Sequence, residues 1–168
     1  WAEGGRLRLD VSADLRAVAR VVADDVGRMG APGRIALTLP DAPVMSEVDP
    51  DAFGILCRNL LENALRHGAE AAPVAVTLKA DGQLIVANDG RMVPREALDR
   101  LTARFERAGA RTDGSGLGLA IVAAIAERIG SRLVLKSPRP GSASGFQASV
   151  RLPIKEPSAC PRARTVSR

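Results

Sequence analysis

The 168-residue chain has few aromatic residues and few cysteines, and both shortages exclude functions. Aromatic side chains make up 2% of the residues and tyrosine is absent, so a surface that stacks single-stranded nucleic acid has almost nothing to be built from. The two cysteines, Cys57 and Cys160, lie in an apolar helical run and in a polar tail, unlike the disulfide framework of a small secreted domain. We therefore expect a protein of the reducing cytoplasm.

Long hydrophobic runs are also missing. No apolar run reaches the ~18 residues that a membrane-spanning helix needs, and neither a signal peptide nor an initiator Met precedes Trp1. We expect no direct membrane contact by this chain. We interpret it as a fragment of a longer protein, and any anchor in the inner membrane would belong to another part of that protein.

Positive charge is concentrated near the C-terminus. The formal net charge is +5, of which residues 154–168 supply +3, through Lys155, Arg162, Arg164 and Arg168 against Glu156, leaving +2 for residues 1–153. No basic face indicates nucleic-acid binding. The composition, 46% hydrophobic and 26% charged, is typical of one globular domain, which we place at residues 7–153 before a disordered basic tail at 154–168.

Hydrophobic periodicity predicts helices alternating with short strands. Helices are expected over residues 12–29, with Ser12 as the cap, 49–67, 94–101 and 117–129. Strands are expected over residues 34–39, 43–48, 74–78, 84–86, 133–135 and 146–152. Because Asp81-Gly82 is a hairpin turn signal, the strands cannot all be parallel. The fold class predicted is an α/β sandwich with a mixed sheet.

The helix over residues 49–67 carries a polar stripe opposite its apolar face. A step of about 100° per residue places Asn59, Asn63 and Arg66 in one narrow stripe with His67 at its edge. Amide oxygens suit a Mg²⁺ ion that keeps several waters and is otherwise held by phosphate oxygens, and Arg66 would add positive charge for the same phosphates. Taken alone, the stripe is better explained as a solvated face without any ligand.

Two further segments have the composition of ligand-binding loops. Gly114-Ser115-Gly116-Leu117-Gly118-Leu119 precedes an apolar helix, so its backbone can approach phosphate oxygens at a positive helix end. It is neither a P-loop nor a dinucleotide-binding fingerprint, and a flexible helix-entry loop is the alternative. Residues 86–94 end a strand in a polar turn where Asn88 can accept a hydrogen bond from an exocyclic amine, although Asn-Asp-Gly is also simply a good turn.

Taken together, these segments resemble the nucleotide-binding boxes of sensor histidine kinases in order and spacing. Asn59 to Ala64 resembles the N box, Val86 to Pro94 the G1 box, Leu101 to Arg107 the F box, and Gly114 to Val122 the G2 box. Gly141 to Pro153 resembles the closing turn and strand. The resemblance spans roughly residues 7–153 and implies the Bergerat ATP-binding fold of the GHKL group, a mixed sheet backed by three helices with a lid over ATP.

The resemblance also implies roles for individual residues. Asn63 falls on the Mg²⁺ ligand, Asn59 lies one turn earlier, and Arg66 and His67 occupy phosphate-side positions. Asn88 falls on the adenine-recognising Asp, and the glycine of the G1 box is Gly90. The G2 glycines are Gly114, Gly116 and Gly118, with Ser115, Leu117 and Leu119 between and after them. Arg107 matches an arginine next to the lid, which would be short and formed by residues 106–115.

Three positions depart from the family pattern. Asn88 replaces the Asp of the G1 box, Met92 replaces its second glycine, and Thr102 replaces the first F-box Phe. An amide oxygen still accepts a hydrogen bond from the adenine amine, and Met92 can pack on the ring as a flexible apolar contact. We expect ATP binding that is weak for the family.

The function that the resemblance implies is phosphoryl transfer. The domain would bind Mg-ATP and donate the γ-phosphate to a histidine on a separate dimerisation domain, to which residues 1–6 would be the linker, and a response regulator would act downstream. Asn59, Asn63 and Arg66 would carry the catalysis. The GHKL ATPases and serine kinases have a Glu where this chain has Asn59, so hydrolysis is disfavoured. The alternatives are a degenerate nucleotide-binding or docking module and a GHKL-type ATPase.

Overall fold

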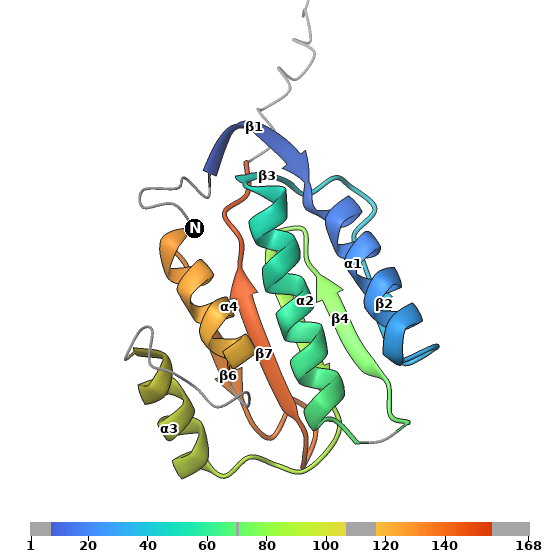
Figure 1. Cartoon of the computed structure of the whole chain (residues 1–168), viewed down its shortest axis with the longest axis vertical. Coiled ribbons are helices and arrows are strands. Elements are labelled where there is room, and N and C mark those ends of the chain that lie inside the picture. Colours follow the sequence, from blue (N-terminus) through green and yellow to red (C-terminus); the bar gives the residue numbers. More distant parts are fainter. Residues whose placement is uncertain (1–7, 70, 107–116, 156–168) are drawn as a thin grey trace, which may run out of the picture.

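A computed structural model describes residues 8–69, 71–106 and 117–155 of the chain, and Figure 1 shows helices layered on one face of a twisted sheet. The strands are β1 (Arg8–Asp14), β2 (Ile35–Thr38), β3 (Met45–Val48), β4 (Val74–Leu78), β5 (Gln83–Asn88), β6 (Val134–Lys136) and β7 (Phe146–Arg151). The helices are α1 (Leu15–Gly30), α2 (Pro50–His67), α3 (Arg95–Glu106) and α4 (Leu117–Arg128).

The main sheet is mixed, as the hairpin signal predicted. Its strand order is β2-β4-β5-β7-β6, with β2 parallel to β4 and every other neighbouring pair antiparallel. The turn at Asp81 and Gly82 joins β4 to β5 and sets Val76 opposite Val86. A separate two-stranded sheet pairs β1 with β3. This arrangement confirms the expected α/β sandwich. It also brings the end of β5 close to the C-terminal end of α2.

The core lies between the sheet and helices α1, α2 and α4, with α2 in the middle (Figure 1). On α2, Phe53, Leu56 and Leu60 are at most 1% exposed, and each such burial contributes about 2 kcal/mol. The helix begins where Asp49 accepts a hydrogen bond from the backbone N–H of Asp51, with Pro50 at the first turn. Because this apolar face of α2 is buried, the polar stripe on the opposite face is directed away from the core.

Helix α1 begins at Leu15, capped by Asp14, so the expectation that Ser12 caps it is wrong. The Asp14 carboxylate accepts hydrogen bonds from the backbone N–H groups of Arg16 at 3.0 Å and Val44 at 3.1 Å. Its hydrogen bonds with the Arg16 side chain hold the Asp14 pKa below its usual value. Ser12 lies instead in β1, because that segment pairs with β3, a partner that local periodicity did not reveal.

The largest remaining differences from the sequence prediction are at the end of α3 and at the start of the C-terminal tail. Helix α3 continues to Glu106 instead of ending at residue 101. Residues 154 and 155, which we expected to begin the disordered tail, continue from Pro153 along β3, where Ser46 Oγ donates to the carbonyl of Pro153 and the Lys155 N–H donates to the Met45 carbonyl at 2.7 Å. Among the described residues, no helix combines the length and the apolar composition that crossing a bilayer requires.

Candidate nucleotide-binding site

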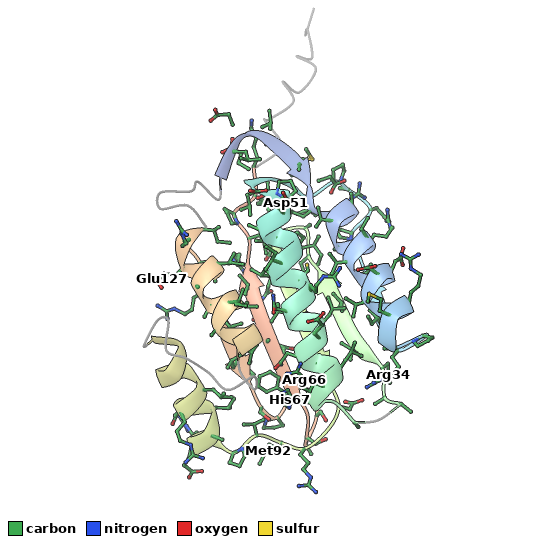
Figure 2. All side chains as sticks on the ribbon, viewed as in Figure 1. Arg34, Asp51, Arg66, His67, Met92 and Glu127 are labelled. Atoms are coloured by element: carbon green, nitrogen blue, oxygen red, sulfur yellow. The ribbon has the colours of Figure 1, made fainter. Side chains whose placement is uncertain are left out.

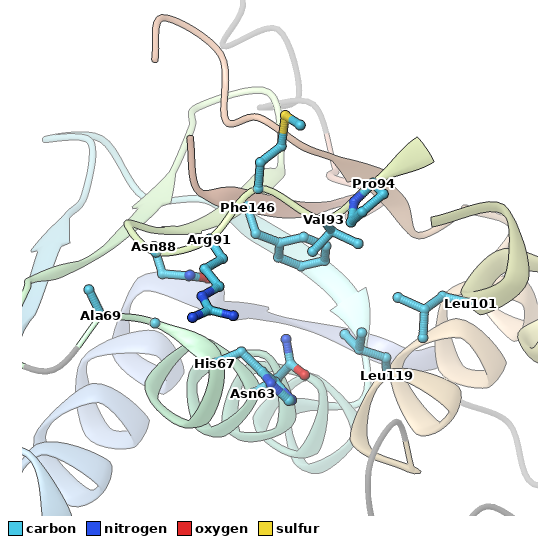
Figure 3. A pocket seen from close by; sticks show the side chains of 13 residues that line it. Asn63, His67, Ala69, Asn88, Arg91, Val93, Pro94, Leu101, Leu119 and Phe146 are labelled. Carbon is cyan, nitrogen blue, oxygen red and sulfur yellow. The ribbon is translucent and has the colours of Figure 1, made fainter. Parts of the chain in front are cut away.

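A pocket of about 680 Å³ opens between the C-terminal half of α2, the loop after β5, and helices α3 and α4 (Figure 3). Polar groups enter it from α2 and from the end of β5, and apolar side chains form most of the remaining wall. The lining residues are Asn63, His67, Gly68, Ala69, Asn88, Gly90, Arg91, Met92, Val93, Pro94, Leu101, Leu119 and Phe146. A pocket of this size can accept a nucleotide-sized ligand.

Asn88, the last residue of β5, places an unsatisfied acceptor in the pocket wall. The residue is 2% exposed, and its Nδ2 donates to the carbonyl of Asp89 at 3.2 Å. Its Oδ1 is buried without a hydrogen-bond partner among the described residues. Leaving a buried acceptor unpaired costs about 1–3 kcal/mol. The arrangement fits a ligand that brings its own N–H donor, as an aminopurine does.

Apolar side chains line one side of the cavity beside Asn88. Figure 3 shows Val93, Leu101, Leu119 and Phe146 around one side of the cavity, contributed by a loop, two helices and β7. Phe146 is 6% exposed and stands directly opposite Asn88 in the β5–β7 register. A flat aromatic heterocycle that pairs its edge with Asn88 would have its faces against these side chains.

Helix α2 brings Asn63 and His67 to the pocket, one turn apart on the face away from the core. Partial burial, and to a lesser degree the positive charge of Arg66, lower the pKa of His67 below its usual value, which favours the neutral imidazole. Arg66 is exposed at the C-terminal end of α2 (Figure 2) and does not line the pocket. Of the predicted polar stripe, Asn63 and His67 therefore face the cavity directly.

Asn59 occupies a different position from Asn63. Its Nδ2 donates to the Ile55 carbonyl at 2.8 Å, and a Cβ added to Gly118 would lie 3.2 Å from its Oδ1. Asn59 is thus a contact between α2 and the start of α4 and is not among the residues that line the pocket. A side chain at position 118 would crowd that contact unless Asn59 shifted by a few tenths of an ångström.

The loop after β5 approaches the end of α2 closely through Gly90. This residue has φ +147, and a Cβ there would lie 3.2 Å from both the Ala69 nitrogen and the His67 carbonyl oxygen. The Ala69 N–H donates to the carbonyl of Asp89 at 2.7 Å, and the Asp89 carboxylate pairs with Arg139 at 3.0 Å. These contacts fix the loop that carries Asn88 and the 49% exposed Met92 (Figure 2).

Part of the predicted site lies outside the described residues: Arg107, Gly114, Ser115 and Gly116. Leu117 begins α4, and Leu119 is 3% exposed in the pocket wall. Conversely, sequence reasoning did not select Arg91, Val93, Leu101 or Phe146, which line the pocket. Arg91 and Val93 lie inside the polar turn that was noticed, whereas no local signal could single out Phe146, whose position follows from strand register.

The donor set near Asn63 bears on a metal ion. Within the described residues no three His, Cys, Asp or Glu side chains gather into a metal site, so this part of the protein offers no cage of its own. One neutral amide beside a nucleotide pocket fits Mg²⁺, which keeps several waters and takes its other ligands from phosphate oxygens.

Comparisons with known proteins agree with this geometry. The profile of the family described as "Histidine kinase-, DNA gyrase B-, and HSP90-like ATPase" matches residues 48–156. Sensor protein QseC of Escherichia coli K12 is 39% identical over 117 residues, which are 69% of this chain and 25% of QseC. The probable sensor kinase SilS of Salmonella typhimurium is 34% identical over 140 residues, 79% of this chain and 28% of SilS.

Solved structures show the same fold. The mycobacterial sensor histidine kinase MprB matches with a TM-score of 0.68 and 25% identity, covering 86% of this chain and 97% of that one. The cytoplasmic segment of QseC matches with a TM-score of 0.59 and 24% identity, covering 87% and 80%. The chain spans about a quarter of the length of the curated relatives that it matches.

Proposed function

Because the chain belongs to the histidine kinase-, DNA gyrase B- and HSP90-like ATPase family and has the fold of histidine kinase catalytic domains, we propose that it transfers the γ-phosphate of ATP to a histidine on a separate dimerisation domain. The ATP-binding domain would comprise residues 7–155, with residues 1–6 as the linker and 156–168 as the tail. The phosphorylated histidine would then supply a response regulator. The cytoplasmic segment of QseC supports a cytoplasmic location for this domain too.

The observation that carries the proposal is the unpaired Oδ1 of Asn88, buried in the wall of a 680 Å³ pocket that Asn63 borders on another side. Oδ1 would accept from the base, and the apolar wall would hold the ring. The phosphates would then extend along α2 toward the start of α4, where free backbone N–H groups and the helix dipole attract anions. The predicted loop at residues 114–119 and Arg107 would contact the phosphates there.

Phosphoryl transfer requires positioning and neutralisation of charge more than covalent chemistry. Asn63 would orient the phosphates together with Mg²⁺, and Arg66 would supply positive charge at the end of α2. When bound, Mg²⁺ would neutralise negative charge on the phosphate oxygens. Asn59 would contribute by holding the start of α4, through its contact with Gly118. His67 would border the nucleotide without acting as acceptor, because it is part of the pocket wall.

The residues around α2 favour transfer to an imidazole over hydrolysis. A GHKL-type ATPase would need a carboxylate at position 59, and the nearby Glu62 points elsewhere: it is exposed and lies 4.0 Å from Arg58. Without a base to activate water, a nucleophile that needs no activation is the better acceptor. The chain's own single histidine is His67, so the fragment alone would not autophosphorylate.

A direct binding experiment tests the first step. Titration with a fluorescent ATP analogue, with and without Mg²⁺, should show saturable binding that Mg²⁺ strengthens, and Asn63→Ala should remove the Mg²⁺-dependent part. Arg20→Ala, on the exposed face of α1, is the matched control and should bind like the unaltered chain. Absence of saturable binding at millimolar nucleotide would leave the degenerate docking module as the function.

Mixing the chain with a separately purified pair of dimerisation helices from a histidine kinase tests the second step. With ATP labelled at the γ-phosphate, an acid-labile label should appear on the histidine of the added helices and none on this chain. Steady release of phosphate without labelling would instead support the ATPase alternative.

A further inference from the structure

The end of the pocket nearest β5 is electrostatically positive. Arg91 lines it and is exposed, and among the described residues it has no ion pair and no side-chain hydrogen bond. The one carboxylate of the same loop, Asp89, is occupied by Arg139 at 3.0 Å. No acidic side chain lines the pocket where the structure describes it. Figure 3 shows the Arg91 guanidinium directed into the cavity from the same loop as Asn88.

The orientation of the Asn88 amide is fixed from outside the pocket. Its Nδ2 donates to the Asp89 carbonyl at 3.2 Å, and that carbonyl also accepts the Ala69 N–H at 2.7 Å. Rotating the amide by half a turn would place Oδ1 against the carbonyl oxygen and lose the bond. The pocket therefore presents a hydrogen-bond acceptor at Asn88 and up to five donors at Arg91. These two residues are three positions apart in the sequence.

Adenine and guanine differ in the hydrogen-bonding groups that they present to Asn88 and Arg91. Adenine carries an amine at C6, whereas guanine carries a carbonyl oxygen at C6 with N–H donors at N1 and N2. Oδ1 of Asn88 can accept from the adenine amine or from the guanine N–H groups. A guanidinium is a good donor to O6 of guanine, and a neutral amide repels that oxygen less than a carboxylate would.

We propose that the base end of this pocket accepts guanine as well as adenine nucleotides, with Asn88 Oδ1 accepting from a base N–H and Arg91 donating to the C6 carbonyl oxygen. This relaxed base specificity rests on the nucleotide binding proposed above. Met92, half-exposed on the same loop, adds an apolar contact that does not distinguish the two bases.

Competition against a ribose-labelled fluorescent ATP analogue, with Mg²⁺ in excess, measures the affinities for ATP, GTP and ITP. We expect GTP and ITP to bind within about tenfold of ATP. ITP has the C6 carbonyl and N1–H of guanine but lacks its N2 amine, so it isolates the C6 contact. Arg91→Ala should weaken GTP and ITP about tenfold more than ATP, since one good contact of this kind discriminates by about 1–3 kcal/mol.

Asn88→Asp should also shift the preference toward ATP, because a carboxylate repels O6 of guanine. Arg91→Lys retains the charge and should keep part of the GTP binding, and Arg20→Ala should change none of the ratios. Circular dichroism of each variant checks that it folds.

Three outcomes overturn the inference. GTP binding more than about 100-fold weaker than ATP binding in the unaltered chain would show that adenine is selected. Equal weakening of all three nucleotides by Arg91→Ala would place the guanidinium on the phosphates instead of the base. Absence of ATP binding would refute the proposed function itself, and with it this inference, and is distinguishable from the first two results.

Discussion

Asn88 shows at the residue scale how a binding group weakens the fold that carries it. Its Oδ1 is buried without a hydrogen-bond partner among the described residues, which costs about 1–3 kcal/mol until a ligand supplies a donor. Natural binding sites commonly keep such groups at the expense of stability.

Replacing Asn88 by Leu should therefore separate stability from binding. Leucine has the same side-chain branching and no acceptor, and the Asp89 carbonyl keeps its bond from Ala69, so we expect the free energy of unfolding to rise by about 1 kcal/mol while nucleotide binding is lost. Urea unfolding and titration with the fluorescent analogue measure the two effects. Asn63→Ala is the control, expected to reduce binding without raising stability; a destabilised Asn88→Leu chain that still binds would contradict this account.

At the scale of elements, the contact of α2 with α4 depends on one glycine. Gly118 lies at the start of α4, where an added Cβ would stand 3.2 Å from Asn59 Oδ1. That separation is tighter than most Cβ contacts, so the helices sit as close as the glycine allows.

A double-mutant cycle tests this contact. Gly118→Ala should destabilise the unaltered chain because the methyl group crowds Asn59, whereas in an Asn59→Ala background it should stabilise by up to about 1 kcal/mol, since alanine is the better helix former. The sign change is read from urea unfolding of the four proteins. If Gly118→Ala had the same effect in both backgrounds, the two residues would not be coupled.

At the scale of the whole molecule, residues 153–155 join the main sheet to the small one. They continue from β7 and lie along β3, through the hydrogen bonds of Ser46 Oγ and the Met45 carbonyl. Ile154 packs against the core, so close to Gly82 that a Cβ there would lie 2.7 Å from its Cγ2. The segment that follows the last strand thus contacts both sheets.

Shortening the chain tests the importance of that segment. A chain that ends at Leu152 should lose about 3 kcal/mol of stability, from two hydrogen bonds and one partly buried isoleucine. A chain that ends at Lys155 should unfold like the full one, because it keeps the hydrogen bonds of residues 153–155 and the packing of Ile154. Ile154→Ala in the full chain avoids a new terminus and should show part of the loss; equal stability of all four proteins in urea would show that the segment contributes nothing.

The sequence by itself determined the features that depend on neighbouring residues. The Asp49-Pro50 start of α2, the polar stripe of that helix and the Asp81-Gly82 hairpin were predicted because periodicity and turn chemistry act over a few residues. The order of the nucleotide-binding boxes was identified from its resemblance to that of sensor histidine kinases. Together these features were enough to give the fold class and the ATP-binding family.

Only the tertiary structure decided which residues of these patterns meet. It turned Asn59 toward Gly118 while leaving Asn63 in the pocket, and it set Phe146 opposite Asn88 by strand register. It also paired β1 with β3, which moved the helix cap from Ser12 to Asp14. Each of these outcomes depends on packing between segments distant in the chain, and local sequence preferences do not specify such contacts.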